Sequence, residues 1–257
     1  MKNTPSQKKY QKGTSGAKSA KEAKLGIGVT GSPKAIFQRK QDKHPKEREE
    51  DSLKNLKGKD LELALRARFP KKTWKPSVML VPNPVVMLSC GGGKEKIRPN
   101  IVTVAWAGIV NTEPPMLSVS IRPERLSHEI IMKTREFVVN IPSASLSKVV
   151  DWCGMKSGRD VDKFAEMRLT SLPAEQVSCP IIADCPINIE CKVAKVIPLG
   201  THDMFIAKIV AVQIAESLLD KKGKLCLEDA DLLCYAHSEY HLLGKKIGAF
   251  GFSVRKR

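Results

Sequence analysis

The hydrophobic positions of this chain gather in short runs that begin near residue 74 and continue toward its C-terminal end. The runs are rich in Val and Ile and are separated by Pro, Gly and Asn. They read SVMLVPNPVVMLSCGGG, NIVTVAWAGIVN, MLSVSI, EFVVNIP, PINIECKVAKVIPLG and DMFIAKIVAVQIAE. Short β-branched runs bounded by turn residues are typical of antiparallel strands. We therefore predict a mainly β fold, a barrel of six or seven strands.

Two intervals between the predicted strands have helical character. The first, SHEIIMKTR, offers Ser127 as an N-cap before Ile130, Ile131 and Met132. The second, SASLSKVVDWCGM, leads into the charged loop KSGRDVDKFAEM. The sequence has no G-x-G-x-x-G turn followed by a helix, which argues against a Rossmann domain. The prediction is a barrel with a few helices packed around it.

The N-terminal third differs from the rest in composition. Residues 1–77 hold 21 Lys and Arg against 8 Asp and Glu, whereas the remaining residues hold 23 against 19. Residues 1 to about 50 have few large apolar side chains, so burial cannot offset the entropy cost of ordering them. We expect a basic, largely disordered extension over residues 1–73, with a short amphipathic helix between Glu49 and Phe69 that Gly58 weakens. A folded domain over residues 74–257 follows.

The basic extension has two interpretations. It is either a solvated tail or a contact with nucleic acid or another anionic surface. Neither interleaved aromatic residues nor a recognisable nucleic-acid-binding motif supports the second interpretation. The solvated tail is therefore the simpler one.

Cysteine usage and hydropathy bear on where the protein works. The seven cysteines form no C-x-x-C pair and have no zinc-site spacing. Reduced thiols in a cytoplasm explain them better than a secreted disulfide framework does. No uninterrupted apolar segment is long enough to cross a membrane, and the N-terminus lacks the apolar core of a secretory signal. We expect a cytoplasmic protein without membrane association.

The stretch SVSIRPERLSH, residues 118–128, ends a predicted strand with a concentration of hydrogen-bond donors. Ser120 lies on the strand, Arg122 and Arg125 lie in the turn, and Ser127 opens the predicted helix. Guanidinium groups, hydroxyls and the free N–H groups at a helix start are the donors that bind phosphate. An N-capped helix after an exposed basic turn explains the same residues, and the pattern alone leaves both interpretations open.

Two further stretches carry candidate binding residues. PNIVTVAWAG gives Asn100 and Trp106 the same parity and Thr103 the other, and an indole beside polar groups suits a flat heteroaromatic ring. A core tryptophan is the alternative. GTHDMFIAKI places His202 and Asp203 at the opening of a strand, as an acid–base pair or as structural residues. The other histidines are scattered without ligand spacing, so we predict no metal site.

The order of these pieces resembles the flavin reductase-like, FMN-binding split-barrel family that includes flavoredoxin. The resemblance runs from about Pro82 to Phe252. It rests on PNIVTVAWAGIVNTEPPMLSVSIRPERLSHEIIMKTREFVVNIPS, then SGRDVDKFA, CPINIECKV, GTHDMFIAKIV and YHLLGKKIGAFG. The first piece is highly specific, and the others gain weight from their order and spacing. The basic N-terminal third departs from the family pattern.

The resemblance implies an FMN-binding split β-barrel that is typically a homodimer with FMN near the interface. Asn100 and Trp106 would lie beside the flavin, and the backbone at Val110 and Asn111 would face the isoalloxazine edge. The phosphate and ribityl chain would be held by Ser120, Arg122, Arg125 and Ser127. The further cofactor contacts implied are Lys163, His202 and Tyr240, with Tyr240 toward the ring face. Thr103 is a candidate cofactor contact from its place near Trp106 in the sequence. Lys163 and His202 would approach from this subunit or its partner.

The implied function is an oxidoreductase that passes electrons from NADH or NADPH through FMN to a small-molecule or protein acceptor. Two alternatives stay open: an FMN electron carrier reduced by a protein partner, and a flavin-binding module tethered by its basic extension. The cofactor performs the redox chemistry, and the protein needs an anion clamp, an apolar slot and donors for the ring. A general base is not required, and we assign no catalytic residue.

Overall fold

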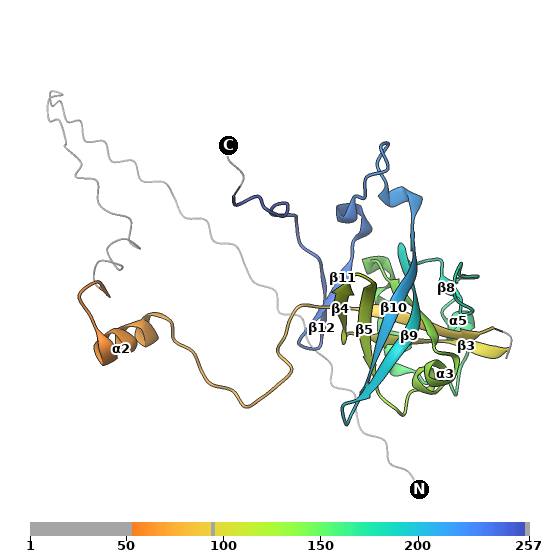
Figure 1. The fold of residues 1–257 in the computed structure, drawn as a ribbon, viewed down its shortest axis with the longest axis horizontal. Coiled ribbons are helices and arrows are strands. Elements are labelled where there is room, and N and C mark those ends of the chain that lie inside the picture. Colours follow the sequence, from red (N-terminus) through yellow and green to blue (C-terminus); the bar gives the residue numbers. More distant parts are fainter. Residues whose placement is uncertain (1–52, 94–95, 255–257) are drawn as a thin grey trace, which may run out of the picture. The chain divides into compact units, whose positions relative to one another are not determined.

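The computed structural model describes residues 53–93 and 96–254, and the chain divides into two compact units, Met1–Trp74 and Lys75–Arg257 (Figure 1). The disorder predicted for residues 1 to about 50 lies outside the described residues. In the first unit the helix α2 spans Gly58–Arg68, within the interval predicted to hold a helix. Gly58 begins this helix, with a φ of +57° that favours glycine, and none of the helix side chains is buried.

The second unit is built on a seven-stranded antiparallel sheet in the order β3-β2-β6-β9-β10-β5-β4. Its strands are β2 (Val86–Gly92), β3 (Ile97–Val104), β4 (Ala107–Thr112), β5 (Pro115–Ile121), β6 (Glu136–Ile141), β9 (Ile187–Pro198) and β10 (Asp203–Ile214). The predicted mainly β fold is confirmed, with seven strands in the main sheet.

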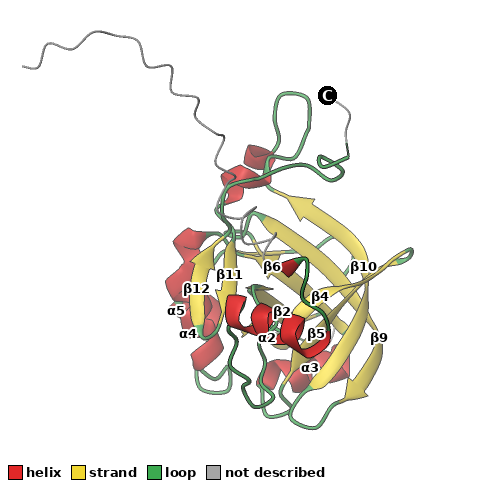
Figure 2. Ribbon diagram, turned by 90° about the vertical axis from the view of Figure 1, so that its left-hand side faces the viewer, coloured by secondary structure: helices red, strands yellow, loops and turns green. Residues whose placement is uncertain are grey.

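The two edge strands of this sheet, β3 and β4, follow each other directly in the chain. Only Ala105 and Trp106 separate them. Because so short a link reaches about 10 Å at most, the two edges lie close together and the sheet curls into a barrel (Figure 2). The Trp106 carbonyl accepts the Ser120 N–H at 2.9 Å, which fixes the link against β5. We call the junction between β3 and β4 the seam.

A small sheet and several helices flank the barrel. The small sheet, in the order β1-β11-β12, consists of β1 (Asn83–Pro84), β11 (Leu233–Ala236) and β12 (Glu239–Leu242). The other elements are α3 (Leu126–Thr134), α4 (Ser147–Met155), α5 (Lys163–Glu166), η1 (Ala144–Leu146), η2 (Glu216–Leu218), η3 (Leu227–Ala230), β7 (Ser171–Leu172) and β8 (Ile181–Ile182). Helices α3 and α4 confirm the two helical intervals predicted from the sequence.

One detail of the helix prediction is wrong. Ser127 is not the N-cap of α3, because the helix begins at Leu126 and Arg125 occupies the cap position. Ser127 lies in the first turn and is fully buried, and its hydroxyl accepts a hydrogen bond from Asn100 Nδ2 at 2.9 Å. The hydroxyl therefore joins α3 to β3, and it does not cap the helix.

The two largest clusters of buried apolar side chains pack against the main sheet. Leu88, Val119 and Phe205 belong to the cluster inside the barrel. Met87, the neighbour of Leu88 on β2, belongs to a second cluster that includes Val150 of α4. Successive residues of a strand point to opposite faces, so β2 is buried on both sides. This explains why the strand begins with three apolar residues in a row, Val86, Met87 and Leu88, without polar alternation.

Two features of the described residues, the cysteines and the helices, are relevant to the expectation of a cytoplasmic protein without membrane association. All seven cysteines are free, and five of them are buried. Burial raises the pKa of Cys90 to about 12 and that of Cys153 to about 11, so both thiols stay protonated near neutral pH. Within residues 53–93 and 96–254, no helix is long and apolar enough to cross a membrane.

Candidate cofactor site

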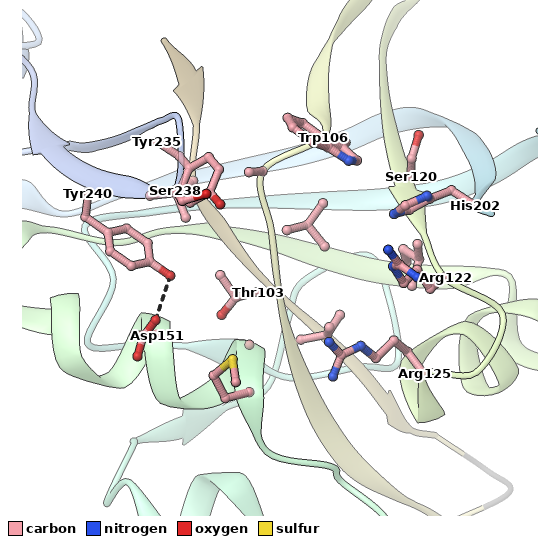
Figure 3. A pocket seen from close by; sticks show the side chains of 17 residues that line it. Thr103, Trp106, Ser120, Arg122, Arg125, Asp151, His202, Tyr235, Ser238 and Tyr240 are labelled. Atoms are coloured by element: carbon pink, nitrogen blue, oxygen red, sulfur yellow. Dashed lines mark hydrogen bonds between the residues drawn. The ribbon is translucent and has the colours of Figure 1, made fainter. Parts of the chain in front are cut away.

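A cavity of about 380 Å³ lies beside the seam, and we call it the main cavity (Figure 3). It is lined by Val85, Val102, Thr103, Val104, Ala105, Trp106, Ser120, Ile121, Arg122, Arg125, Asp151, Gly154, Met155, His202, Tyr235, Ser238 and Tyr240. Seven of the twelve residues predicted from the sequence are among them: Thr103, Trp106, Ser120, Arg122, Arg125, His202 and Tyr240. Segments distant in sequence thus meet at one cavity.

One side of the main cavity carries the basic groups, and we call Arg122, Arg125 and His202 the cationic wall (Figure 3). The Arg125 N–H donates to the Arg122 carbonyl at 3.1 Å, so both arginines belong to one tight turn after β5. Arg122 is exposed and Arg125 is half-buried. The Arg122 guanidinium lies 3.6 Å from the Glu124 carboxylate, an exposed and therefore weak pair. Two guanidinium groups at one cavity end form an anion-binding surface.

His202 completes the cationic wall from the start of β10. Burial, and next the nearby Arg122 charge, lower the pKa of its imidazole. Its Nδ1 lies 3.0 Å from the Thr201 hydroxyl. A bound anion would oppose both effects, because a negative charge beside His202 favours the protonated ring.

Of the two interpretations of His202 and Asp203, the acid–base pair is not formed. Asp203 Oδ2 instead lies 2.8 Å from His128 Nε2, and the His128 ring packs edge-on against Phe205 with 5.3 Å between centroids. This pair joins α3 to β10, and thereby the elements that begin beside Arg125 and His202. It therefore holds the two halves of the cationic wall together. Within the described residues, no group of His, Cys, Asp and Glu could hold a metal ion.

The opposite side of the main cavity consists of Tyr235, Ser238 and Tyr240 from the β11–β12 hairpin and Asp151 from α4, and we call it the aromatic wall (Figure 3). The Tyr240 hydroxyl donates to Asp151 Oδ1 at 3.2 Å. The two tyrosine rings meet edge to face with 5.7 Å between centroids. Burial, and next the Asp151 carboxylate, raise the pKa of Tyr240 to about 12, so the phenol stays protonated. This wall offers flat apolar surface with polar groups at its rim.

A smaller cavity of about 220 Å³ adjoins the cationic wall and holds three more of the predicted residues, Asn100, Ser127 and Lys163, together with Arg125. Lys163 is buried, and its Nζ donates to the carbonyls of Ile101 and Cys153, each at 2.7 Å. Burial lowers the pKa of Lys163 to about 8, and the Arg125 charge also lowers it. The Lys163 ammonium thus links α5 to β3 and α4 within one subunit.

Gly158 allows the small cavity to be this compact. A Cβ atom at this position would lie 2.0 Å from Asn100 Oδ1, so any larger residue would displace the Asn100 side chain. Asn100 also donates to Ser127, and its buried amide leaves little room to move. Lys156 and Ser157, from the same loop, line this cavity too.

Two of the predicted residues line neither of these two cavities. Val110 lies at an irregularity in the pairing of β4 with β5 and lines a separate cavity, which Trp106 also lines. The Asn111 amide donates to the Pro114 carbonyl at 2.8 Å within the β4–β5 hairpin. Neither side chain lines the main cavity.

The sequence reasoning missed Asp151, Tyr235 and Ser238. The two tyrosines face each other in the register of β11 and β12, separated by a turn at His237 and Ser238. Both turn residues have positive φ, +47° and +70°, which ordinarily favours Asn and Gly. Without such residues the turn carries no sequence signal. Asp151 is one acidic residue on a helix, and only the fold brings it to the hairpin.

The donor set of the main cavity fits FMN. The cationic wall suits a phosphate, the Ser120 hydroxyl suits a polyol chain, and Trp106 with the aromatic wall suits a planar ring. A cavity with an anion-binding end and an aromatic end matches a molecule with a phosphate at one end and a ring at the other. This fit comes from the residues alone.

Comparisons with known proteins agree with this description. Residues 78–244 match the model of the family described as "Flavin reductase like domain". Flavoredoxin of Desulfovibrio vulgaris (Miyazaki F) is 31% identical, with a TM-score of 0.66 over 72% of this chain and 98% of that one. An uncharacterized protein of Pyrococcus abyssi is 30% identical over 66% of this chain and 95% of its own length. The FMN reductase (NADH) RutF of Bradyrhizobium diazoefficiens is 28% identical over 40% of this chain and 56% of that one. The chain therefore belongs to the flavin reductase-like family, and its barrel is the split barrel of that family.

Proposed function

We propose that the chain binds FMN in the main cavity and passes electrons from NADH or NADPH through it to an acceptor. The observation that carries this proposal is the pairing of the cationic and aromatic walls across one cavity at the seam. The relative named FMN reductase (NADH) supports a nicotinamide as the electron donor. When bound, FMN would supply the redox chemistry.

The proposed roles of the residues follow from their positions. Arg122, Arg125 and Ser120 hold the phosphate and the adjoining chain, and His202 takes up a proton as the anion binds. Trp106, Tyr235 and Tyr240 contact the ring. Asn100, Ser127 and Lys163 support the cationic wall from the small cavity. Thr103 donates to the Val150 carbonyl at 2.5 Å and fixes α4 against the cavity. Backbone contact at Val110 and Asn111 stays a prediction.

We also propose that the protein is a cytoplasmic homodimer, in line with its family resemblance and its free thiols. The acceptor is a small molecule or a protein. Similarity to flavoredoxin favours a second candidate function, an FMN electron carrier that a protein partner reduces. The two functions share the cofactor site and differ in the electron donor.

The test is an absorption spectrum of the purified full-length protein, loaded with FMN if needed, before and after anaerobic addition of NADH or NADPH. Free FMN at the same concentration is the control for direct reduction in solution. Faster bleaching of the flavin bands with protein than without it supports the reductase and identifies its donor. Bound flavin that neither nucleotide bleaches supports the electron carrier. Failure to bind FMN at all contradicts both.

A further inference from the structure

A second cavity, of about 530 Å³, also lies beside Trp106. It is lined by Ser77, Val78, Met79, Leu80, Asn83, Trp106, Ala107, Gly108, Ile109, Val110, Ser118 and Ser120. Trp106 and Ser120 line both cavities. The second cavity therefore adjoins the proposed flavin site at the seam of the barrel.

The second cavity differs sharply from the main cavity in charge. Among the twelve described residues that line it, none is Asp, Glu, Lys or Arg, although these types make up 28% of the chain. Its polar groups are three serines and one asparagine, Ser77, Asn83, Ser118 and Ser120. None of the described lining residues would give an anion a charged partner, so the cavity suits an uncharged ligand better than a charged one.

The outer side of the second cavity is a defined strap, Ser77–Leu80, which precedes β1. The Asn83 amide donates to the Leu80 carbonyl at 2.7 Å, and the Met79 N–H donates to the Ser77 carbonyl at 3.0 Å. These bonds hold the strap in a turn just before β1 pairs with β11. The strap is thus anchored to the hairpin that forms the aromatic wall.

The floor of the second cavity leaves room for a flat ligand. Gly108 has no atom within 4 Å of the place where a Cβ would stand. Val78, Leu80 and Ile109 are 74%, 85% and 66% exposed, so apolar surface stands open on both sides of this space. A planar ring inserted there would contact the Trp106 indole and cover these side chains.

We propose that the second cavity binds an uncharged, flat ring compound that bears a carbonyl oxygen, such as a quinone. The ring lies between the strap and β4, and a serine hydroxyl or the Asn83 amide donates to the carbonyl. The proposal that such a compound binds depends on this cavity alone, and it does not require bound FMN. Its role as the electron acceptor rests on the proposed flavin function, because only the neighbouring main cavity would supply electrons.

The test is calorimetric titration of the full-length protein with menadione, and with naphthoquinone sulfonate as a charged analogue. We expect menadione to bind at least about tenfold more tightly, because the sulfonate has no cationic partner in the cavity. The titration is done with FMN-free and FMN-loaded protein, and FMN affinity is measured separately. Failure of FMN binding would thus contradict the proposed function without touching this inference. Equal affinity for the two compounds, or no binding of menadione, would overturn the inference.

Matched variants locate the binding. Leu80→Asp and Ile109→Asp each place a charge at the cavity, whereas Val212→Asp places one on β10, at a residue that is 51% exposed and not among the cavity lining. We expect the first two to weaken menadione binding at least about tenfold and the third to leave it unchanged. An equal loss in all three would overturn the proposal. A change of native mass in Leu80→Asp and Ile109→Asp only, with menadione affinity intact, would assign the surface to a second copy of the chain and would also overturn it.

Discussion

The two walls of the main cavity face the same space but arise in different ways. The basic residues of the cationic wall come largely from one turn, in which Arg122 and Arg125 follow β5 directly. The aromatic wall joins Asp151 of α4 to Tyr240 of β12, which lies 89 positions later in the chain. The two arginines of the first wall are a local property of a strand and its turn, whereas His202 comes from the residue before β10. The second exists only after the hairpin has packed against the helix.

This difference indicates that the two walls contribute differently to FMN binding. A phosphate carries most of the charge of FMN, and charge-assisted hydrogen bonds are stronger than neutral ones. The cationic wall should therefore provide most of the binding free energy. The aromatic wall, whose one hydrogen bond within the wall links two of its own side chains, should mainly shape the space for the ring. The predictions below test this difference.

The largest expected effect is that of Arg125→Ala. Loss of one guanidinium contact to a phosphate removes about 1.5–3 kcal/mol, so FMN affinity should fall by roughly tenfold to about a hundredfold. FMN titration followed by flavin fluorescence measures it. Arg159→Ala is the control, since it removes the same charge from an exposed pair with Glu129 outside the main cavity. Similar losses in both variants would show that overall charge matters and the wall does not.

Ser127 is left unchanged in that experiment for a structural reason. Its buried hydroxyl accepts from the Asn100 amide, so Ser127→Ala would leave a buried donor unpaired and cost about 1–3 kcal/mol of stability. Combining Arg125→Ala with Ser127→Ala would therefore mix a loss of stability with a loss of FMN binding.

A smaller effect is expected from His202→Gln, and it depends on pH. The pKa of His202 is lowered in the folded protein from a reference value of 6.5, so the unfolded chain binds more protons just below that pH. The free energy of unfolding should therefore rise with pH over the range just below about 6.5. Above that pH the histidine is neutral in both states and no longer affects the profile. His202→Gln should flatten that part of the profile. Urea unfolding of the FMN-free protein at a series of pH values tests this, and an unchanged profile would contradict it.

The smallest effect is expected from Tyr240→Phe. The change removes the hydrogen bond to Asp151 but keeps the ring and its contact with Tyr235. A partly exposed hydrogen bond of this kind contributes about 0.5 kcal/mol, so FMN affinity should change by no more than about threefold. The same fluorescence titration applies, with Tyr235→Phe as the matched variant. A loss of FMN affinity as large as that of Arg125→Ala would contradict the proposal that the cationic wall provides most of the binding free energy.

Most strands of the barrel could be predicted from the sequence. The β-branched runs and their turn residues predicted the strands, because period and turn chemistry are local properties. The donors around SVSIRPERLSH predicted the cationic wall for the same reason. The mistaken cap at Ser127 shows the limit of local reasoning, since a serine near a helix start serves equally well as a cap or as a partner for Asn100.

Tertiary structure decided the rest. The partner of Asp203 is His128 and not its neighbour His202, because α3 packs against the start of β10. Lys163 contacts two carbonyls, Ile101 and Cys153, that only the packing of α5 on β3 and α4 brings together.

By itself, then, the sequence determined the strands, the two helical intervals and the basic turn, each of which depends on neighbours within a few residues. Only the tertiary structure placed Trp106 at the seam, where it lines both a charged cavity and an uncharged one. The reason is geometric. The seam forms where the first and last strands of the sheet order meet, and that meeting depends on the pairing of all seven strands together.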